Sequence, residues 1–244
     1  PWLVATALIH SVSVVAARGI FKSWTVLLAI LSFSLSLVGT FIVRSGLLTS
    51  VHSFASDPAR GAFILGILLF AIGIPLALFA WRGPQLIDDG DYKPVSRETG
   101  LLVNNFLLTA ATIVVLIGTF YPLGLEMVSG ARITVGPPYF DATFNPIMGA
   151  LVLTMAFGPV MAWRHGTLPA LRLVANCTIV AALAAFLAGL VFFTGISLAG
   201  LAGIGITAWL GGGILADIFH RLKPSSRARA GKRPPIQVPV WGMW

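Results

Sequence analysis

Residues 24–43 read WTVLLAILSFSLSLVGTFIV, an apolar run that contains no charged residue. A membrane-spanning helix needs about 20 consecutive, predominantly apolar residues, so this run is long enough to cross a bilayer. Similar runs occur at residues 1–17, 62–81, 101–122, 146–163, 173–194 and 198–219. The first run is short, and residues 239–244 resemble the aromatic start of another span. The sequence therefore predicts an all-α, polytopic transmembrane helical bundle over residues 1–219. It has about seven spans and is truncated at both ends, as in an internal fragment of a longer chain.

The composition supports a membrane protein, because 57% of the residues are hydrophobic and only 10% are charged. Ordinary soluble domains carry about 25% charged residues. No nucleic-acid partner is inferred from the net charge of +8, since the topology of the loops accounts for it.

Basic residues orient the spans, because Lys and Arg favour the cytoplasmic side of short loops. With alternating sides, segments 18–23, 82–100, 164–172 and 220–238 carry thirteen of the 16 Lys and Arg residues, against three on the other side (Arg44, Arg60 and Arg132). The first group is therefore predicted to be cytoplasmic, and the loops near 44–61 and 123–145 to be periplasmic. Residues 220–238 form a basic cytoplasmic linker that can touch anionic membrane lipid.

Three predicted spans carry polar stripes with helical spacing, which indicate faces directed into the bundle or packed against neighbouring helices. The stripes are Thr6, His10 and Ser13; Ser32, Ser36, Thr40 and Arg44; and Asn105, Thr109 and Thr112. Glycines of the last span, among them Gly211-Gly212-Gly213, indicate close helix packing.

Two histidines stand out as candidate ligands. His10 lies inside an apolar run, where an ionisable side chain is costly and by default functional. It could hydrogen-bond to a neighbouring helix, or it could bind a haem iron, for which a neutral imidazole is a good axial ligand. His52 lies in a polar stretch between two spans, at the predicted outer surface, and is either a solvated loop residue or a second ligand.

Arg44 and Arg60 flank the His52 stretch at the same predicted surface. Because Arg is the preferred bidentate partner of carboxylates, these two residues are candidates for contact with haem propionates. The pair Asp57-Pro58 is suited to begin the next helix, with Asp as N-cap and Pro in the first turn. No catalytic residue is assigned, and His165 and His220 are interpreted as ordinary residues of the cytoplasmic span ends.

Several segments resemble the CcmF family, the CcmF/CcsA-like haem-handling proteins of bacterial cytochrome c maturation (System I haem lyase). The likeness is dense over residues 1–61 and clear to about residue 146. It rests on Pro1-Trp2-Leu3, Ala7-Leu8-Ile9-His10-Ser11, Phe21-Lys22-Ser23-Trp24-Thr25, residues 33–46, Val51-His52-Ser53-Phe54-Ala55-Ser56-Asp57-Pro58-Ala59-Arg60-Gly61, Ser96-Arg97-Glu98, Asn104-Asn105, residues 118–122 and residues 135–140.

The resemblance implies a multi-pass protein of the bacterial inner membrane. It implies that His10 is an axial ligand of a resident b haem, and that His52 ligates substrate haem at the periplasmic surface. It also implies that haem arrives from the chaperone CcmE and is attached by thioether bonds to CxxCH cysteines of apocytochrome c, presented by CcmH/CcmI-type subunits. The resident haem would reduce the substrate iron, with quinol as the implied electron donor. The partner ligands of both haems fall outside this sequence, so we expect this stretch alone to be inactive.

Two other functional classes stay open from the residues alone. A secondary transporter would have broken helices near the membrane midplane, and Pro75 and Pro159 could break two of the spans. A non-catalytic membrane scaffold subunit would leave His10 and His52 without a role.

Overall fold

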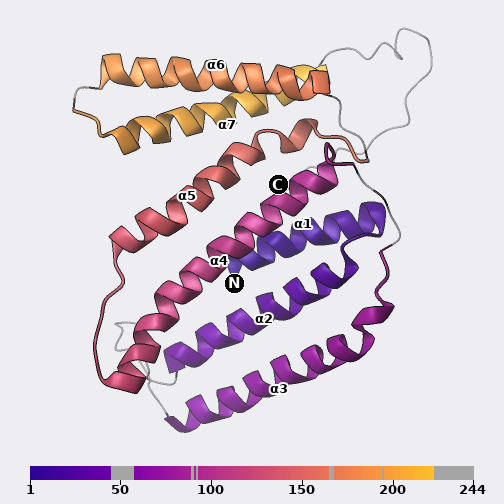
Figure 1. Cartoon of the computed structure of the whole chain (residues 1–244), viewed down its shortest axis with the longest axis vertical. Coiled ribbons are helices and arrows are strands. Elements are labelled where there is room, and N and C mark those ends of the chain that lie inside the picture. Colours follow the sequence, from indigo (N-terminus) through magenta and orange to yellow (C-terminus); the bar gives the residue numbers. More distant parts are fainter. Residues whose placement is uncertain (45–57, 89–90, 92, 165–167, 194, 223–244) are drawn as a thin grey trace. The chain divides into compact units, whose positions relative to one another are not determined.

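The computed structural model describes residues 1–44, 58–88, 91, 93–164, 168–193 and 195–222 (Figure 1). These residues form seven α-helices and, after α3 and α5, two short 3₁₀ helices; the described ranges contain no strand. The helices are α1 (Trp2–Arg18), α2 (Lys22–Arg44), α3 (Pro58–Arg82), η1 (Gly83–Gln85), α4 (Arg97–Ser129), α5 (Pro137–Met155), η2 (Gly158–Val160), α6 (Leu168–Phe192) and α7 (Leu198–Leu222). The predicted all-α class is confirmed.

Six of the helices, α2 to α7, are long and apolar enough to cross a membrane, whereas α1 is a shorter apolar helix of 17 residues. Six of the seven predicted spans each fall largely on one helix, whereas the span predicted at 146–163 covers the second part of α5 and η2. The protein is therefore a multi-pass membrane protein, as the hydropathy predicted. In lipid a helix satisfies its backbone N–H and C=O groups within one segment, which is why hydropathy alone locates the spans.

The loop predicted over residues 123–145 is largely helical. α4 continues to Ser129 and α5 begins at Pro137, so only residues 130–136 of that range lie outside a helix. The described structure contains no membrane, and the predicted periplasmic placement of this segment stays a prediction.

The sequence predicted that the fifth span starts at residue 146. This prediction was wrong, because Pro146 lies inside α5. The helix begins instead at Pro137. A proline is tolerated in the first turn, because the N–H groups there have no intrahelical acceptor and a missing N–H costs nothing. The added turns are polar: the side-chain amide of Asn145 donates a hydrogen bond to the carboxylate of Asp141 over 2.9 Å. Hydropathy marks the apolar part of a helix, so it missed this polar beginning.

The two prolines proposed as helix breaks behave differently. Pro75 lies within α3, which continues to Arg82. Pro159 lies in η2, after α5 has ended at Met155. A proline cannot donate the helical hydrogen bond to the carbonyl four residues earlier. Of these two prolines, Pro75 is accommodated inside its α-helix, whereas Pro159 follows the end of one.

The first unit of the chain comprises Pro1–Gly90 and Asn105–Pro146. Within it α1 packs against α2 and α2 against α3, and these helices lie side by side in chain order (Figure 1). A tight turn joins α1 to α2, in which Gly19 and Phe21 adopt left-handed conformations with φ of 70° and 68°. Gly19 also caps α1, since its N–H donates to the carbonyl of Val15 over 2.8 Å.

Lys22 ties this turn to the segment that follows α3. Its backbone N–H donates to Asp88 Oδ1 over 3.1 Å, and its Nζ donates to the carbonyl of Ile87 over 2.8 Å. The Asp88 carboxylate therefore lies at the positive N-terminal end of α2, where a negative charge is favourable. The start of α2 and the segment after α3 are thus tied together at one end of the helix pair.

The second unit comprises Asp91–Asn104 and Ile147–Trp244. Its main packing is between α6 and α7, which run side by side (Figure 1). A Cβ atom on Gly213 would lie 3.0 Å from the carbonyl oxygen of Ala156, and one on Gly212 would lie 3.2 Å from the Cα of Thr178. The predicted role of these two glycines in close packing is confirmed, whereas Gly211 has no atom within 4 Å of such a Cβ.

The predicted polar stripes differ in their surroundings. On α4, Asn105 and Thr112 are buried, as expected for a packed face. On α2, however, Ser36, Thr40 and Arg44 are exposed within this chain, so the predicted packing of this stripe against a neighbouring helix stays a prediction. The hydroxyl of Thr40 donates to the backbone carbonyl of Ser36 over 3.1 Å, which satisfies it without a neighbouring helix.

Candidate functional site

His10 lies on the buried face of α1, where its side chain is only 9% exposed. This face also contains Val4, Ala7, Ser11 and Val14, which recur at the three- and four-residue spacing of one helix face. Apart from His10 and Ser11 the face is apolar. The imidazole is therefore held within an apolar part of the first unit, as its position in the sequence suggested.

One hydroxyl pair lies next to His10 in the sequence and connects two helices. Ser11 Oγ in α1 lies 2.7 Å from Thr25 Oγ1 in α2. Thr25 already donates its single hydroxyl proton to the carbonyl of Phe21 over 2.8 Å. Ser11 must therefore be the donor in the interhelical bond, which fixes the rotation of α1 beside α2 and with it the direction of the neighbouring residue.

The other two members of the predicted α1 stripe play a smaller part. Thr6 and Ser13 are half-buried, and their hydroxyls donate to backbone carbonyls four residues earlier in α1, over 3.0 and 2.9 Å. The stripe therefore contains one buried ionisable residue and two hydroxyls that the helix itself satisfies.

His10 fits one axial position of a haem. A neutral imidazole in apolar surroundings is a common haem ligand, and the described part of α1 offers one such group. Within the described residues no group of three or more His, Cys, Asp or Glu side chains could hold a metal ion. The residue thus suits a cofactor that takes one ligand from each of two elements.

The second candidate group lies at the junction of α2 and α3. Arg44 is exposed at the last residue of α2, and Arg60 is in the first turn of α3, although its side chain lies outside the described part. His52 also lies outside the described residues. Because α2 and α3 pack against each other, the backbones at Arg44 and Arg60 belong to the same end of this helix pair. Asp57 is not described either, but α3 begins at Pro58, as the pair Asp57-Pro58 predicted.

Two further histidines and one cysteine are the other residues of the chain with an imidazole or thiol group. His165 lies outside the described residues, and His220 belongs to α7 with a side chain that is not described. The single cysteine, Cys177, is exposed on α6. Cys177 is not assigned as a ligand, and His10 stays the candidate ligand whose side chain the structure describes.

A buried polar junction at the start of α4 was not predicted as a site, although Ser96-Arg97-Glu98 was noted as a motif. Glu98 is 0% exposed, and both of its carboxylate oxygens accept a hydrogen bond from the backbone N–H of Arg164 at 3.1 Å. The N–H of Arg97 also donates to the carbonyl of Ala162 over 3.0 Å. The first turn of α4 thereby holds the segment that connects α5 to α6.

Ser96 completes this junction as the N-cap of α4. Its Oγ accepts a hydrogen bond from the N–H of Thr99 over 3.3 Å, and it lies 3.1 Å from the Thr99 hydroxyl. Thr99 Oγ1 in turn donates to the carbonyl of Lys93 over 3.1 Å. A serine before a helical run is a readable N-cap signal, so the sequence could have located this helix start. It could not have shown that Arg164 meets it, because the two lie 66 residues apart.

Asn105 is another polar residue that the structure buries completely. It is 0% exposed, and neither atom of its side-chain amide has a hydrogen-bond partner among the described residues. A buried amide without partners is costly, by about 1–3 kcal/mol. The sequence placed Asn105 on a packed face but gave no sign that its amide would lack partners there.

The chain was compared with protein families, curated proteins and solved structures. No family model matches it. It is 51% identical to the cytochrome c-type biogenesis protein CcmF of Pseudomonas aeruginosa over 248 residues, which cover 100% of this chain and 37% of that protein. It is 55% identical to the cytochrome c-type biogenesis protein CycK of Rhizobium meliloti over 168 residues, or 69% of this chain and 25% of the relative.

A solved structure of the cytochrome c haem lyase CcmF matches with a TM-score of 0.67 and 26% identity, over 94% of this chain and 33% of that one. The chain thus spans well under half the length of the relatives it matches. The sequence identity over the whole chain and the agreement of the helices show that the chain belongs to the CcmF family of cytochrome c-type biogenesis proteins.

Proposed function

We propose that this chain forms part of a cytochrome c haem lyase of the bacterial inner membrane. The proposed activity is the attachment of haem to the CxxCH cysteines of apocytochrome c through thioether bonds. The observation that carries the proposal is the 51% identity to a cytochrome c-type biogenesis protein along the whole chain. A buried histidine in an apolar helix, at the position where the family resemblance implies a haem ligand, supports it.

His10 is the proposed axial ligand of a resident b haem. The apolar face of α1 suits a porphyrin, and the Ser11–Thr25 hydrogen bond holds the helix that presents the imidazole. When bound, such a haem supplies one-electron chemistry that can reduce the iron of the substrate haem. The task of the chain is to present the imidazole at a fixed depth and to exclude water from it. Quinol is the proposed electron source.

His52 is the proposed ligand of the substrate haem, with Arg44 and Arg60 as candidates for contact with its propionates. The support is that both arginines belong to the same end of the α2–α3 pair, and that guanidinium groups bind carboxylates in a bidentate way. Two ligands and two arginines would orient the porphyrin so that its vinyl edge meets reduced cysteines. The porphyrin supplies the reacting carbons, and the protein supplies orientation.

The proposed orientation follows from the basic residues. The turn between α1 and α2, the segment between α3 and α4, and the segment between α5 and α6 carry most of the described Lys and Arg residues. If each helix crosses the bilayer, these connections share one side, which the positive-inside rule assigns to the cytoplasm. The His52 segment is then periplasmic, where the haem chaperone CcmE, CcmH/CcmI-type subunits and apocytochrome c are the proposed partners.

The proposal can be tested in the Pseudomonas aeruginosa CcmF, with its matching segment replaced by this sequence, in a strain that lacks its own CcmF. His10→Ala should remove the b-haem absorbance of the purified protein and abolish holo-cytochrome c. His52→Ala should leave that absorbance intact while holo-cytochrome c falls. His220→Ala, a histidine with no assigned role, is the matched control and should change neither.

Added imidazole separates loss of a ligand from misfolding. If His10 is a ligand, free imidazole should restore part of the haem absorbance to the His10→Ala protein. A transporter or a scaffold subunit would bind the same amount of haem with or without His10. Unchanged haem content in the His10→Ala protein would therefore refute the assignment.

A further inference from the structure

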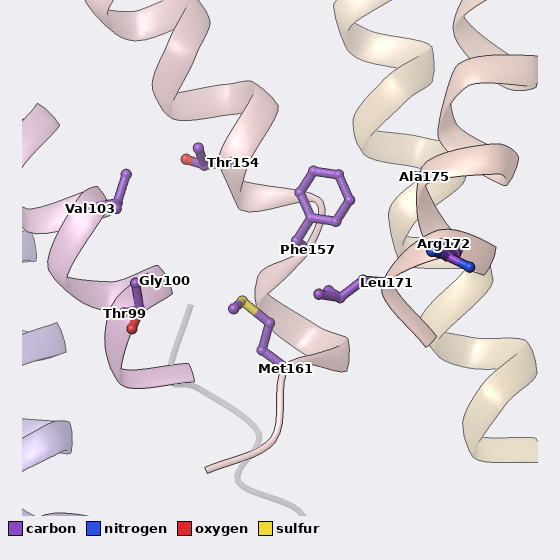
Figure 2. Close-up of a pocket in the computed structure, with 9 residues that line it drawn as sticks. All are labelled: Thr99, Gly100, Val103, Thr154, Phe157, Met161, Leu171, Arg172 and Ala175. Carbon is purple, nitrogen blue, oxygen red and sulfur yellow. The ribbon is translucent and has the colours of Figure 1, made fainter. Parts of the chain in front are cut away.

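The second unit contains an apolar cavity of about 430 Å³ between the N-terminal turns of α4, the end of α5 with η2, and the start of α6 (Figure 2). Gly100 and Val103 line it from α4, Phe157 and Met161 from the α5 end, and Leu171 and Ala175 from α6. The volume lies within the range of about 300–1,000 Å³ that is typical of small-molecule sites.

The interior offers no free hydrogen-bonding group. Two hydroxyl residues line the cavity, and both hydroxyls already donate to backbone carbonyls: Thr99 to Lys93 over 3.1 Å and Thr154 to Leu151 over 2.8 Å. A polar headgroup inside would lose its hydrogen bonds to water without replacing them, which is costly. The interior therefore suits a hydrocarbon chain.

The rim of the cavity is positively charged. Arg172 is exposed, and Figure 2 shows its guanidinium nitrogens directed away from the centre of the cavity. The exposed Arg164 follows Trp163 on the segment after η2, and the Arg97 guanidinium lies 5.2 Å from the Trp163 ring centroid. Paired Trp and Arg residues are typical of the membrane–water interface.

The nearby acidic residue Glu98 does not line the cavity. Glu98 is buried, and its carboxylate accepts the backbone N–H of Arg164 rather than facing outward. An apolar cavity with the exposed Arg172 at its edge is complementary to an anionic amphiphile.

We propose that this cavity binds one acyl chain of an anionic phospholipid, with the phosphate held at the rim by Arg172. The membrane supplies this ligand at high local concentration. A quinone would fill the cavity with a similar hydrocarbon tail, but its uncharged head would gain nothing from the guanidinium group, which binds phosphate strongly. The inference is independent of haem and does not rest on the proposed function.

The test is native mass spectrometry of the full chain in mild detergent, with added dioleoylphosphatidylglycerol, dioleoylphosphatidylcholine or ubiquinone in separate titrations. Phosphatidylglycerol should be retained in preference to the other two. Ala175→Trp places an indole in the cavity and should abolish that retention. Arg172→Gln removes one surface cation and should weaken retention by about fivefold, as expected for one basic residue near an anionic headgroup.

Matched controls keep the outcome specific. Ala184→Trp introduces the same side chain at an exposed position of α6 away from the cavity, and Arg82→Gln removes a cation at the end of α3. Both should retain phosphatidylglycerol like the unaltered protein. Equal retention of phosphatidylcholine, preference for ubiquinone, or full retention by Ala175→Trp would each overturn the proposal. Because Arg172 is exposed, we expect Arg172→Gln to fold normally. It therefore still tests the proposal if Ala175→Trp does not fold.

Discussion

The carboxylate of Glu98 holds Arg164 in a left-handed backbone conformation. Both carboxylate oxygens lie 3.1 Å from the Arg164 nitrogen, and φ of Arg164 is 68°. A non-glycine residue pays about 1–2 kcal/mol in that conformation. A charged hydrogen bond to the N–H contributes a similar amount, so one interaction offsets the other at the connection between α5 and α6.

Replacing Glu98 by Ala should therefore destabilise the second unit by about 1.5–3 kcal/mol, the range for a hydrogen bond to a charged group. The measurement is the free energy of unfolding in mixed micelles. Glu126→Ala is the matched control, because Glu126 bonds Arg132 over 2.7 Å with both side chains exposed. Such exposed pairs contribute about 0–1 kcal/mol. Equal effects of the two substitutions would show that Glu98 contributes no more to the free energy of unfolding than an exposed ion pair does.

The bond between Ser11 and Thr25 should appear as a coupling energy between α1 and α2. In a double-mutant cycle with Ser11→Ala and Thr25→Val, we expect a coupling of about 0.6 kcal/mol, with an upper value near 1.7, as measured for hydrogen bonds within membranes. The same cycle with Thr40→Val in place of Thr25→Val should show none, since Thr40 donates only within α2. A coupling within error of zero for Ser11 and Thr25 would mean that the bond does not fix α1.

Two glycines of α7 that lie two residues apart, Gly211 and Gly213, should respond in opposite ways to alanine. Gly213→Ala brings a Cβ to 2.9 Å from the Ala156 Cβ and 3.0 Å from its carbonyl oxygen, so it should destabilise the protein by about 1–3 kcal/mol. Gly211→Ala meets nothing within 4 Å and should be neutral or stabilising by up to about 1 kcal/mol, because alanine is the better helix former. Thermal unfolding in detergent distinguishes them. If both raise the melting temperature, α7 does not approach Ala156 this closely.

The corner between α4 and α5 depends on Tyr139. Its hydroxyl donates to the carbonyl of Val114 over 2.9 Å. Tyr139→Phe should therefore cost about 0.5–1.5 kcal/mol of stability, the usual net value of one hydrogen bond. Tyr121→Phe is the matched control, because the Tyr121 residue is 59% exposed, and it should change the unfolding free energy by less than Tyr139→Phe. The reverse order would contradict the role of Tyr139 at this corner.

Hydropathy predicted the helices well but not their polar ends. The core of each span was located because an apolar run must satisfy its own backbone in lipid, and only a helix does so within one segment. Asp141 and Asn145 lie in the first turns of α5 and carry no apolar signal, so the start of that helix was placed nine residues late. Nor did the sequence reveal that the Thr40 hydroxyl bonds to Ser36 of its own helix. A hydroxyl that bonds its own helix looks, in sequence, the same as one that bonds a neighbour.

The sequence by itself determined that the chain crosses a membrane several times, and it singled out His10, because charge and hydropathy are properties of the residues themselves. Tertiary structure decided which polar groups meet. Glu98 and Arg164, Ser11 and Thr25, and Tyr139 and Val114 are each separated by at least 14 residues. Their contacts depend on how helices rotate and pack, and helix packing in lipid is set by side-chain shape rather than by hydrophobicity, which all faces of a span share.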